Sequence, residues 1–231
     1  MNNHFKYIWS SFIELFYPKI CLICDEHLSE QEELLCIKCE HHLPLSQYLE
    51  YADNPIEKLF WGRVTIDAAG SLYLFNKGGG IQKMMHQLKY KQNKNVGIWM
   101  GKKLGKHLLT SHRFDNVDLV VPIPLHPKKK FKRGFNQSDL IAQGIEEVSG
   151  WKYADLLQRK DDTDSQTKKG KYERWLNVGS SFQLDPHLQI KNKNILLIDD
   201  VITTGATMEG NIQTLLDGGA ASVSVATVAS A

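Results

Sequence analysis

Beyond about residue 64, hydrophobic residues fall into short runs that alternate with helically spaced sets. Four consecutive large aliphatics, Ile195 to Ile198, are typical of a strand that is buried on both faces. Further strands are expected at 65–75, 118–127, 151–157 and 221–229. Helices are expected where apolar residues recur on one face, at 81–88, 96–108, 138–148 and 208–216. This alternation predicts an α/β fold with a mainly parallel, doubly wound sheet over residues 64–231.

The residues before this domain follow other patterns. Residues 1–17 place large apolar side chains at helical spacing between 4 and 16. We expect an amphipathic helix that packs on the main domain, because a membrane-surface helix would carry more basic residues on its polar face. The irregular stretch 44–63 is interpreted as a linker or as an arm lying over the main domain.

All the cysteines lie between these two segments, in residues 18–43. They form two Cys-x-x-Cys pairs separated by eleven residues, Cys21 and Cys24, then Cys36 and Cys39. Four thiolates at this spacing suit tetrahedral zinc, and so short a segment could hardly fold without a metal. Disulfides are the alternative, which a reducing compartment disfavours. We therefore predict a small zinc ribbon whose Zn²⁺ is structural.

Charged and hydroxyl side chains follow the aliphatic run directly. Asp199 and Asp200 come first, and a loop of hydroxyls around a glycine then leads into the next helix. Ligands bind beyond the carboxyl ends of strands in such sheets, and a helix N-terminus suits a phosphate. Carboxylates can accept hydrogen bonds from a sugar diol or help hold a divalent metal. The pattern predicts a ribose-phosphate site made of Asp199, Asp200, Thr203, Thr204, Gly205, Ala206 and Thr207, rather than an ordinary acidic turn.

Composition indicates the class of protein, and the charged residues are unevenly distributed along the chain. The 231 residues, 42% hydrophobic and 23% charged, are typical of a globular protein with one main domain. No apolar run is long enough to span a bilayer, and the N-terminus lacks the features of a secretory signal, so we expect a cytoplasmic protein. The net charge is only +2, but residues 68–138 hold fourteen Lys and Arg against two acids. This asymmetry suggests an anionic partner, the alternative being a solvated basic helix face.

A polar segment interrupts the domain at about 158–176. It holds almost no apolar residues, so it cannot bury enough surface to fix one conformation. We interpret it as a mobile loop, either a lid or a simple excursion. No residue of the chain stands out as a nucleophile.

The order of these features resembles the ComF family of ComFC- and GntX-like proteins. The run at 197–207 is similar to the phosphoribosyl-pyrophosphate motif of type I phosphoribosyltransferases. The other elements that carry the resemblance are the four cysteines, Leu88-Lys-Tyr90, Val121-Pro-Ile-Pro-Leu125, Arg133-Gly-Phe-Asn-Gln137, Arg159, Thr163, Gln166-Thr167, Arg174 and Asn177-Val178. The resemblance covers residues 18–229.

The resemblance implies a type I phosphoribosyltransferase fold that binds phosphoribosyl pyrophosphate with Mg²⁺, behind a zinc ribbon. It implies that the two acids contact the ribose hydroxyls and that residues 203–207 hold the 5′-phosphate. The turn around 124–127 takes the place of the pyrophosphate loop, with Leu125, His126, Lys128 and Arg133 as candidates on the pyrophosphate side. The flexible catalytic loop corresponds to 158–176, with candidates Arg159, Lys160, Gln166 and Arg174.

Two functions from different classes remain at this point. The first is transfer of a phosphoribosyl group to an unidentified acceptor in nucleotide metabolism or competence. The second is a non-enzymatic accessory of DNA uptake, which binds single-stranded DNA through the basic 68–138 region or senses ribose phosphates. The site supports the ligand better than it supports the reaction.

Overall fold

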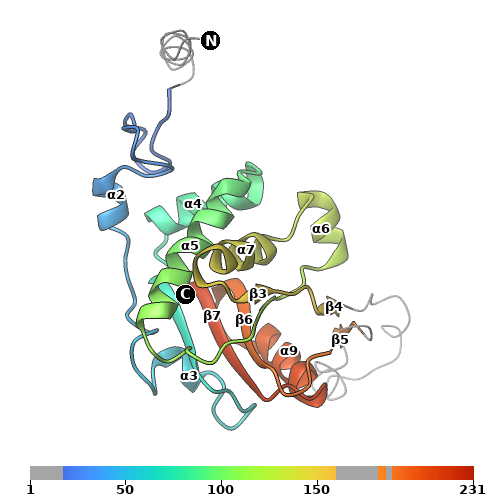
Figure 1. Cartoon of the computed structure of the whole chain (residues 1–231). Coiled ribbons are helices and arrows are strands. Elements are labelled where there is room, and N and C mark those ends of the chain that lie inside the picture. Colours follow the sequence, from blue (N-terminus) through green and yellow to red (C-terminus); the bar gives the residue numbers. More distant parts are fainter. Residues whose placement is uncertain (1–17, 160–181, 186–188) are drawn as a thin grey trace, which may run out of the picture.

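The computed structural model describes residues 18–159, 182–185 and 189–231. At its centre is a five-stranded sheet in which each neighbouring pair of strands is parallel (Figure 1). In spatial order the strands are β1 (Ala69–Leu74), β7 (Ser222–Ser230), β6 (Asn194–Ile202), β2 (Leu119–Pro122) and β3 (Lys152–Tyr153). The predicted parallel α/β architecture is confirmed, and the aliphatic run lies in the middle strand.

Three of the expected strands are shorter in the structure, and the one expected at 65–75 is β1, Ala69–Leu74. The strand expected at 118–127 ends at Pro122, because the prolines that follow have no N–H to donate to a neighbouring strand. The strand expected at 151–157 divides in two. The chain leaves the sheet after Tyr153, and β4 (Leu157–Arg159) pairs instead with β5 (Phe182–Leu184) in a separate antiparallel pair.

Helices cover both faces of the sheet. α4 (Gly80–Tyr90), α5 (Lys94–Thr110) and α7 (Gln137–Ser149) lie on one face, while α3 (Pro55–Lys58) and α9 (Ala206–Asp217) lie on the other (Figure 1). Successive residues of β6 alternate between the two layers. Leu196 and Ile198 join the core beneath α4, α5 and α7, whereas Ile195 and Leu197 join the core beneath α9. This alternation explains why four aliphatics in a row are needed.

Helices α5 and α7 pack unusually closely because glycines face each other. A Cβ on Gly101 would clash with the carbonyl oxygen of Ile141, and one on Gly144 would clash with the carbonyl oxygen of Ile98. The two backbones therefore touch. This close packing fixes the start of α7, which reaches the carboxyl end of β6.

The segments before the main domain pack against it. Residues 18–43 contain α2 (Ile37–His41), whose Glu40 pairs with Lys103 of α5. The stretch 44–63 runs along the outer edge of β1, where the backbone N–H of Ser46 donates to Leu72 and that of Leu74 donates to Pro44. The arm thus covers an otherwise free sheet edge.

Two sequence-based expectations concern the N-terminus and membranes. The amphipathic helix expected at 4–16 lies outside the described residues. Among the helices that the structure does describe, none is both long and apolar enough to cross a bilayer.

Candidate functional site

The two acids end up near the carboxyl end of β6, held by side chains from two helices. Asp199 Oδ1 accepts hydrogen bonds from Ser138 Oγ at 2.9 Å and from the backbone N–H of Asp200 at 2.8 Å. Asp200 Oδ2 lies 2.6 Å from Nζ of Lys89. Ser138 belongs to the first turn of α7 and Lys89 to the last turn of α4. Both acids are therefore fixed from the same face of the sheet.

The environment of the pair favours partners that donate hydrogen bonds or carry positive charge. Burial and the neighbouring Asp200 carboxylate raise the pKa of Asp199 to about 7, while Lys89 acts in the opposite direction. Adjacent carboxylates resist ionising together unless donors or cations compensate them. A sugar diol supplies two such donors.

The hydroxyl loop joins β6 to α9 through a left-handed glycine. Gly205 has φ 73°, and its carbonyl accepts the first bond of α9 from the Glu209 N–H at 2.9 Å. Thr203, Thr204 and Thr207 are exposed. Together with Asp199 and the first residues of α9, the loop lines a small cavity of about 50 Å³. The loop therefore combines exposed hydroxyls with the N-terminal N–H groups of a twelve-residue helix.

The arm supports the back of this loop, which the sequence did not reveal. Phe60 packs beneath Gly205, and a Cβ there would come within 3.2 Å of the ring. Arg63 Nη1 donates to the carbonyl oxygen of Thr204 at 3.3 Å, and Arg63 Nε lies 3.6 Å from a carboxylate oxygen of Glu209. Residues from outside the main domain thus hold the loop in place.

The candidates for the pyrophosphate side do not form a simple turn. Residues Pro127–Arg133 form the short helix α6, with the Nδ1 atom of His126 accepting from the Lys128 N–H at 3.2 Å. Gly134 ends it at φ 78°. Pro at the first helical position and glycine after the last one are a recognised pair of helix boundaries. The turn expected around 124–127 therefore passes at Pro127 into a helix that the sequence analysis did not predict.

This helix changes what each candidate does. His126 caps α6, and Lys128 is exposed on it. Arg133 Nη1 donates to Gln137 Oε1 at 2.7 Å, so this guanidinium is tied to the start of α7. Leu125 instead lines a cavity of about 670 Å³ between α6 and β4, a size that suits small ligands.

The same cavity is bordered by the start of the expected flexible loop. Arg159, at the end of β4, lines it and lies 5.5 Å from the centre of the Phe182 ring. Lys160, Gln166 and Arg174 lie outside the described residues. Asn136 connects the cavity to the acids, because it lines the cavity and precedes Ser138 by two residues.

Comparison with known proteins identifies the family of this chain. Residues 102–231 match the family model described as the phosphoribosyl transferase domain. The chain belongs to this family. It is 28% identical over 219 residues to the DNA utilization protein YhgH of Escherichia coli O157:H7, covering 89% of this chain and 88% of that protein. It is 39% identical over 103 residues to the competence protein ComFC of Streptococcus pneumoniae, covering 45% and 44% of the two chains.

These relatives confirm the predicted ComF membership of this phosphoribosyltransferase-family chain. Among solved structures, it is similar to the glutamine phosphoribosylpyrophosphate amidotransferase of B. subtilis complexed with ADP and GMP. The TM-score is 0.45 at 20% identity, and the match covers 63% of this chain but only 30% of that one.

The family match includes the hydroxyl loop but leaves out other parts of the site. The acids, the loop, α6 and Ser138 all lie within 102–231. Lys89 and Arg63 lie before it, although both contact the loop or the acids. Lys89 lies in the Leu88-Lys-Tyr90 motif, whereas Arg63 and Ser138 lie in no motif that indicates the site. Their spacing from the acids carries no local pattern, so only the fold brings them together.

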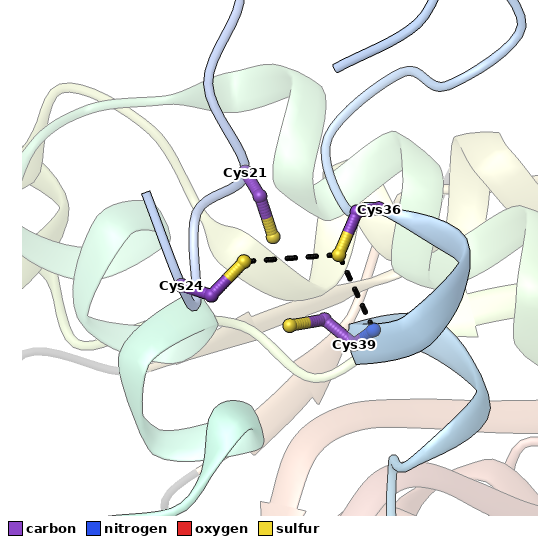
Figure 2. A group of neighbouring side chains, drawn as sticks. All are labelled: Cys21, Cys24, Cys36 and Cys39. Atoms are coloured by element: carbon purple, nitrogen blue, oxygen red, sulfur yellow. Dashed lines mark hydrogen bonds between the residues drawn. The ribbon is translucent and has the colours of Figure 1, made fainter. Parts of the chain in front are cut away.

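The cysteines converge in the segment that precedes the match. Cys21 and Cys24 come from one turn, Cys36 caps α2 and Cys39 lies on it, and their four sulfurs point toward one another (Figure 2). All four Sγ atoms lie within 4.8 Å of one another, with 3.7 Å between Cys24 and Cys36. Tetrahedral zinc at about 2.3 Å from each sulfur requires separations of about 3.8 Å. The four free thiols therefore fit a metal ion.

Proposed function

We propose that this phosphoribosyltransferase-family protein binds phosphoribosyl pyrophosphate and transfers its phosphoribosyl group to an acceptor, in nucleotide metabolism or competence. One observation carries the proposal. The paired carboxylates at the end of β6 directly precede a hydroxyl loop that opens α9. Acceptors for a sugar diol and donors for a phosphate are thus adjacent, as a ribose 5-phosphate requires.

In this proposal the ligand lies across the carboxyl edge of the sheet. The ribose hydroxyls donate to Asp199 and Asp200, and the 5′-phosphate accepts from the N–H groups and hydroxyls of residues 203–207. The diphosphate then extends toward the turn at 124–127, where Leu125 and His126 lie. The flexible loop expected at 158–176 is the candidate to close over it.

The reaction itself asks the protein mainly for positioning and charge. A lone pair of the acceptor forms a bond to the anomeric carbon, while the bond from that carbon to the diphosphate oxygen breaks. The diphosphate leaves with the bonding electrons, and an N–H acceptor loses its proton to solvent. Mg²⁺ bound with the substrate supplies charge neutralisation for the diphosphate. Fixed cations and hydrogen-bond donors of the chain add to it.

Two metal ions have different places in this proposal. Mg²⁺ would arrive with the diphosphate, and the carboxylates of Asp199 and Asp200 are suitable oxygen ligands. Zn²⁺ would be held by the four cysteines as a structural ion, because four thiolates leave no position for a substrate.

Calorimetric titration with phosphoribosyl pyrophosphate and Mg²⁺ tests the proposal. We expect Asp199→Asn and Asp200→Asn each to weaken binding by about tenfold or more, since each removes a charged acceptor. Asp217→Asn is the matched control, because Asp217 lies at the far end of α9, where its carboxylate accepts a hydrogen bond from Gln213 Nε2 at the surface. Its affinity should equal that of the wild type.

Two results would count against the proposal. If wild type and both site variants bind equally poorly, the loop is not a ribose-phosphate site. If binding is tight but incubation with candidate bases and amines releases no diphosphate, the protein binds the ligand without transferring it.

A second function is favoured by α6 and by the names of the relatives. This helix carries Lys128, Lys129, Lys130, Lys132 and Arg133, and its Phe131 is 94% exposed. Cations beside an exposed aromatic ring suit single-stranded nucleic acid, which offers phosphates and bases that stack. We propose as the alternative a non-enzymatic accessory of DNA uptake, which would use this helix to bind single-stranded DNA.

Fluorescence anisotropy with a labelled oligothymidylate separates this alternative from transfer. The Phe131→Ala variant should weaken binding by about 1–3 kcal/mol. Replacing Lys128 and Lys129 by Gln should reduce the salt dependence. Replacing Lys191 and Lys193, exposed lysines elsewhere on the chain, provides the charge-matched control. DNA affinity that is the same in all variants would exclude α6 as the contact.

A further inference from the structure

Lys89 contacts one of the two acids of the proposed site, although it lies outside the residues that match the family model. Its ammonium is 2.6 Å from Asp200 Oδ2, and the two side chains are 22% and 14% exposed. This is therefore a largely buried ion pair on one of the two site acids, and the lysine comes from α4 rather than from residues 102–231.

The end of α4 presents Lys89 at the boundary between core and solvent. Leu88, the residue before it, is fully buried, and Tyr90, the residue after it, is 66% exposed. An ammonium group has three N–H donors. One is directed at Asp200, which leaves two for other partners at the same edge of the sheet.

The position of α4 relative to the hydroxyl loop decides what Lys89 can reach. The loop and the arm that supports it lie with α9 and α3 on one face of the sheet, whereas α4 lies on the opposite face (Figure 1). A ribose 5-phosphate seated with its phosphate on the loop therefore has that phosphate on the α9 side of the acids. Lys89 approaches the acids from the other side.

The positive charge of Lys89 can offset repulsion between the two acids and an anionic ligand. Phosphoribosyl pyrophosphate carries several negative charges near neutral pH, because each phosphate is largely ionised. Two carboxylates in contact with its ribose would repel the diphosphate across the ring. A fixed cation beside the acids, as Lys89 is, offsets this repulsion.

We propose that Lys89 is a substrate-binding residue that contacts the diphosphate of phosphoribosyl pyrophosphate while it pairs with Asp200. This inference rests on the proposed function and assigns a further residue to that site. Helix α4 is then part of the site, and the segment matched as the phosphoribosyl transferase domain does not contain all of it.

Binding of two ligands that share the ribose 5-phosphate tests the assignment. Calorimetry would compare phosphoribosyl pyrophosphate with Mg²⁺ against ribose 5-phosphate, using the full chain. For Lys89→Met we expect the affinity for phosphoribosyl pyrophosphate to fall by about tenfold or more, since a charge-assisted contact is lost. Affinity for ribose 5-phosphate should stay within about twofold, because the loop is untouched.

Two further variants control for charge and for folding. Lys102→Met removes a lysine from a more exposed ion pair, in which Lys102 of α5 lies 2.7 Å from Glu147 of α7, and this variant should bind both ligands as the wild type does. Lys89→Arg restores the positive charge and should recover part of the lost affinity. Thermal unfolding of each variant shows whether it is folded at the temperature of the titration.

The outcomes distinguish failure of the proposed function from failure of the role proposed for Lys89. If the wild type binds neither ligand, the proposed function itself fails. If the wild type binds phosphoribosyl pyrophosphate and Lys89→Met binds it equally well, only the role of Lys89 is refuted. Equal losses for both ligands would also refute it, because Lys89 would then support the site without touching the diphosphate.

Discussion

At the scale of single residues, Asp139 lies beside the proposed site, and the folded protein disfavours the ionised form of its carboxyl group. Its Oδ1 accepts from Asn136 Nδ2 at 2.7 Å, and the same amide donates to the Ile123 carbonyl. Burial and the charge of Asp155 raise the pKa of Asp139 to about 6, against a smaller opposite effect of Lys130. Tyr153 also faces this group.

The raised pKa makes stability depend on pH in a defined direction. The folded protein binds this proton more tightly than the unfolded chain does, so the contribution is complete below pH about 4 and is lost as pH rises through about 6. Asp139→Asn removes the charge while its amide oxygen can still accept from Asn136. We expect the free energy of unfolding at pH 7.5 to increase by about 1 kcal/mol, allowing for partial exposure of the group.

Urea unfolding followed by circular dichroism between pH 4 and 8 measures this effect. The variant should lose less stability than the wild type as pH rises from 4 to 7. Asp118→Asn is the control with the opposite sign, because the Asn194 N–H and Lys193 lower the pKa of Asp118. It should be less stable than the wild type at neutral pH. An Asp139→Asn protein that is also less stable at pH 7.5 would contradict this account.

Residue-scale chemistry was predictable only where the residues are neighbours in sequence. Asp199, Asp200 and the hydroxyl loop form one continuous run, so the sequence alone is enough to propose a ribose-phosphate site there. Ser138 reaches Asp199 from 61 residues away, and Lys89 reaches Asp200 from farther still. Nothing in a local pattern specifies such a pair, because the fold alone sets which helix turns face the strand end.

At the scale of elements, the long periodic segments were predicted well and the short ones were not. The helices expected at 81–88 and 96–108 are α4 and α5, each a few residues longer, and β6 contains the aliphatic run. Helix α6 was missed because its Lys-rich sequence buries nothing, so no hydrophobic period marks it. Its boundary residues, His126, Pro127 and Gly134, were the available signal.

The split between β3 and β4 illustrates a second limit at this scale. Residues 151–157 read as one strand, yet Tyr153 is the last to pair with β2, and Leu157 pairs with Leu184. Strand pairing depends on a partner elsewhere in the chain, so a local pattern cannot show where a strand changes sheets. This change of sheets places β4 opposite α6, and the cavity of about 670 Å³ lies between them.

At the scale of the whole molecule, helix α4 connects the cysteine module, residues 18–43, to the proposed site. Lys83 Nζ donates to the carbonyl oxygen of Ile23, inside the first Cys-x-x-Cys turn, at 2.7 Å. The side chain of Ile23 packs against Gly80, where α4 begins. The other end of α4 carries Lys89 to Asp200. The module therefore contacts one end of the helix whose other end carries Lys89 to the proposed site.

Loss of the metal should consequently weaken ligand binding at a distance. In Cys24→Ser/Cys39→Ser, we expect bound zinc to disappear, the module to unfold locally and the melting temperature to fall, because metal binding and folding are coupled in such small segments. With α4 no longer supported, affinity for phosphoribosyl pyrophosphate should also fall. Gln31→Ala, an exposed change in the same module that keeps all four thiols, should leave zinc, melting temperature and affinity unchanged.

Combining these changes with Lys89→Met tests whether α4 carries the connection. If the module acts through Lys89, the cysteine changes should weaken binding in the wild type but add little in a Lys89→Met background. Elemental analysis gives the zinc content, and calorimetry with excess Mg²⁺ gives the affinity. Losses that add fully in the combined variant would show that the module and Lys89 act independently. Unchanged affinity after zinc loss would show that the main domain forms the site without help from the module.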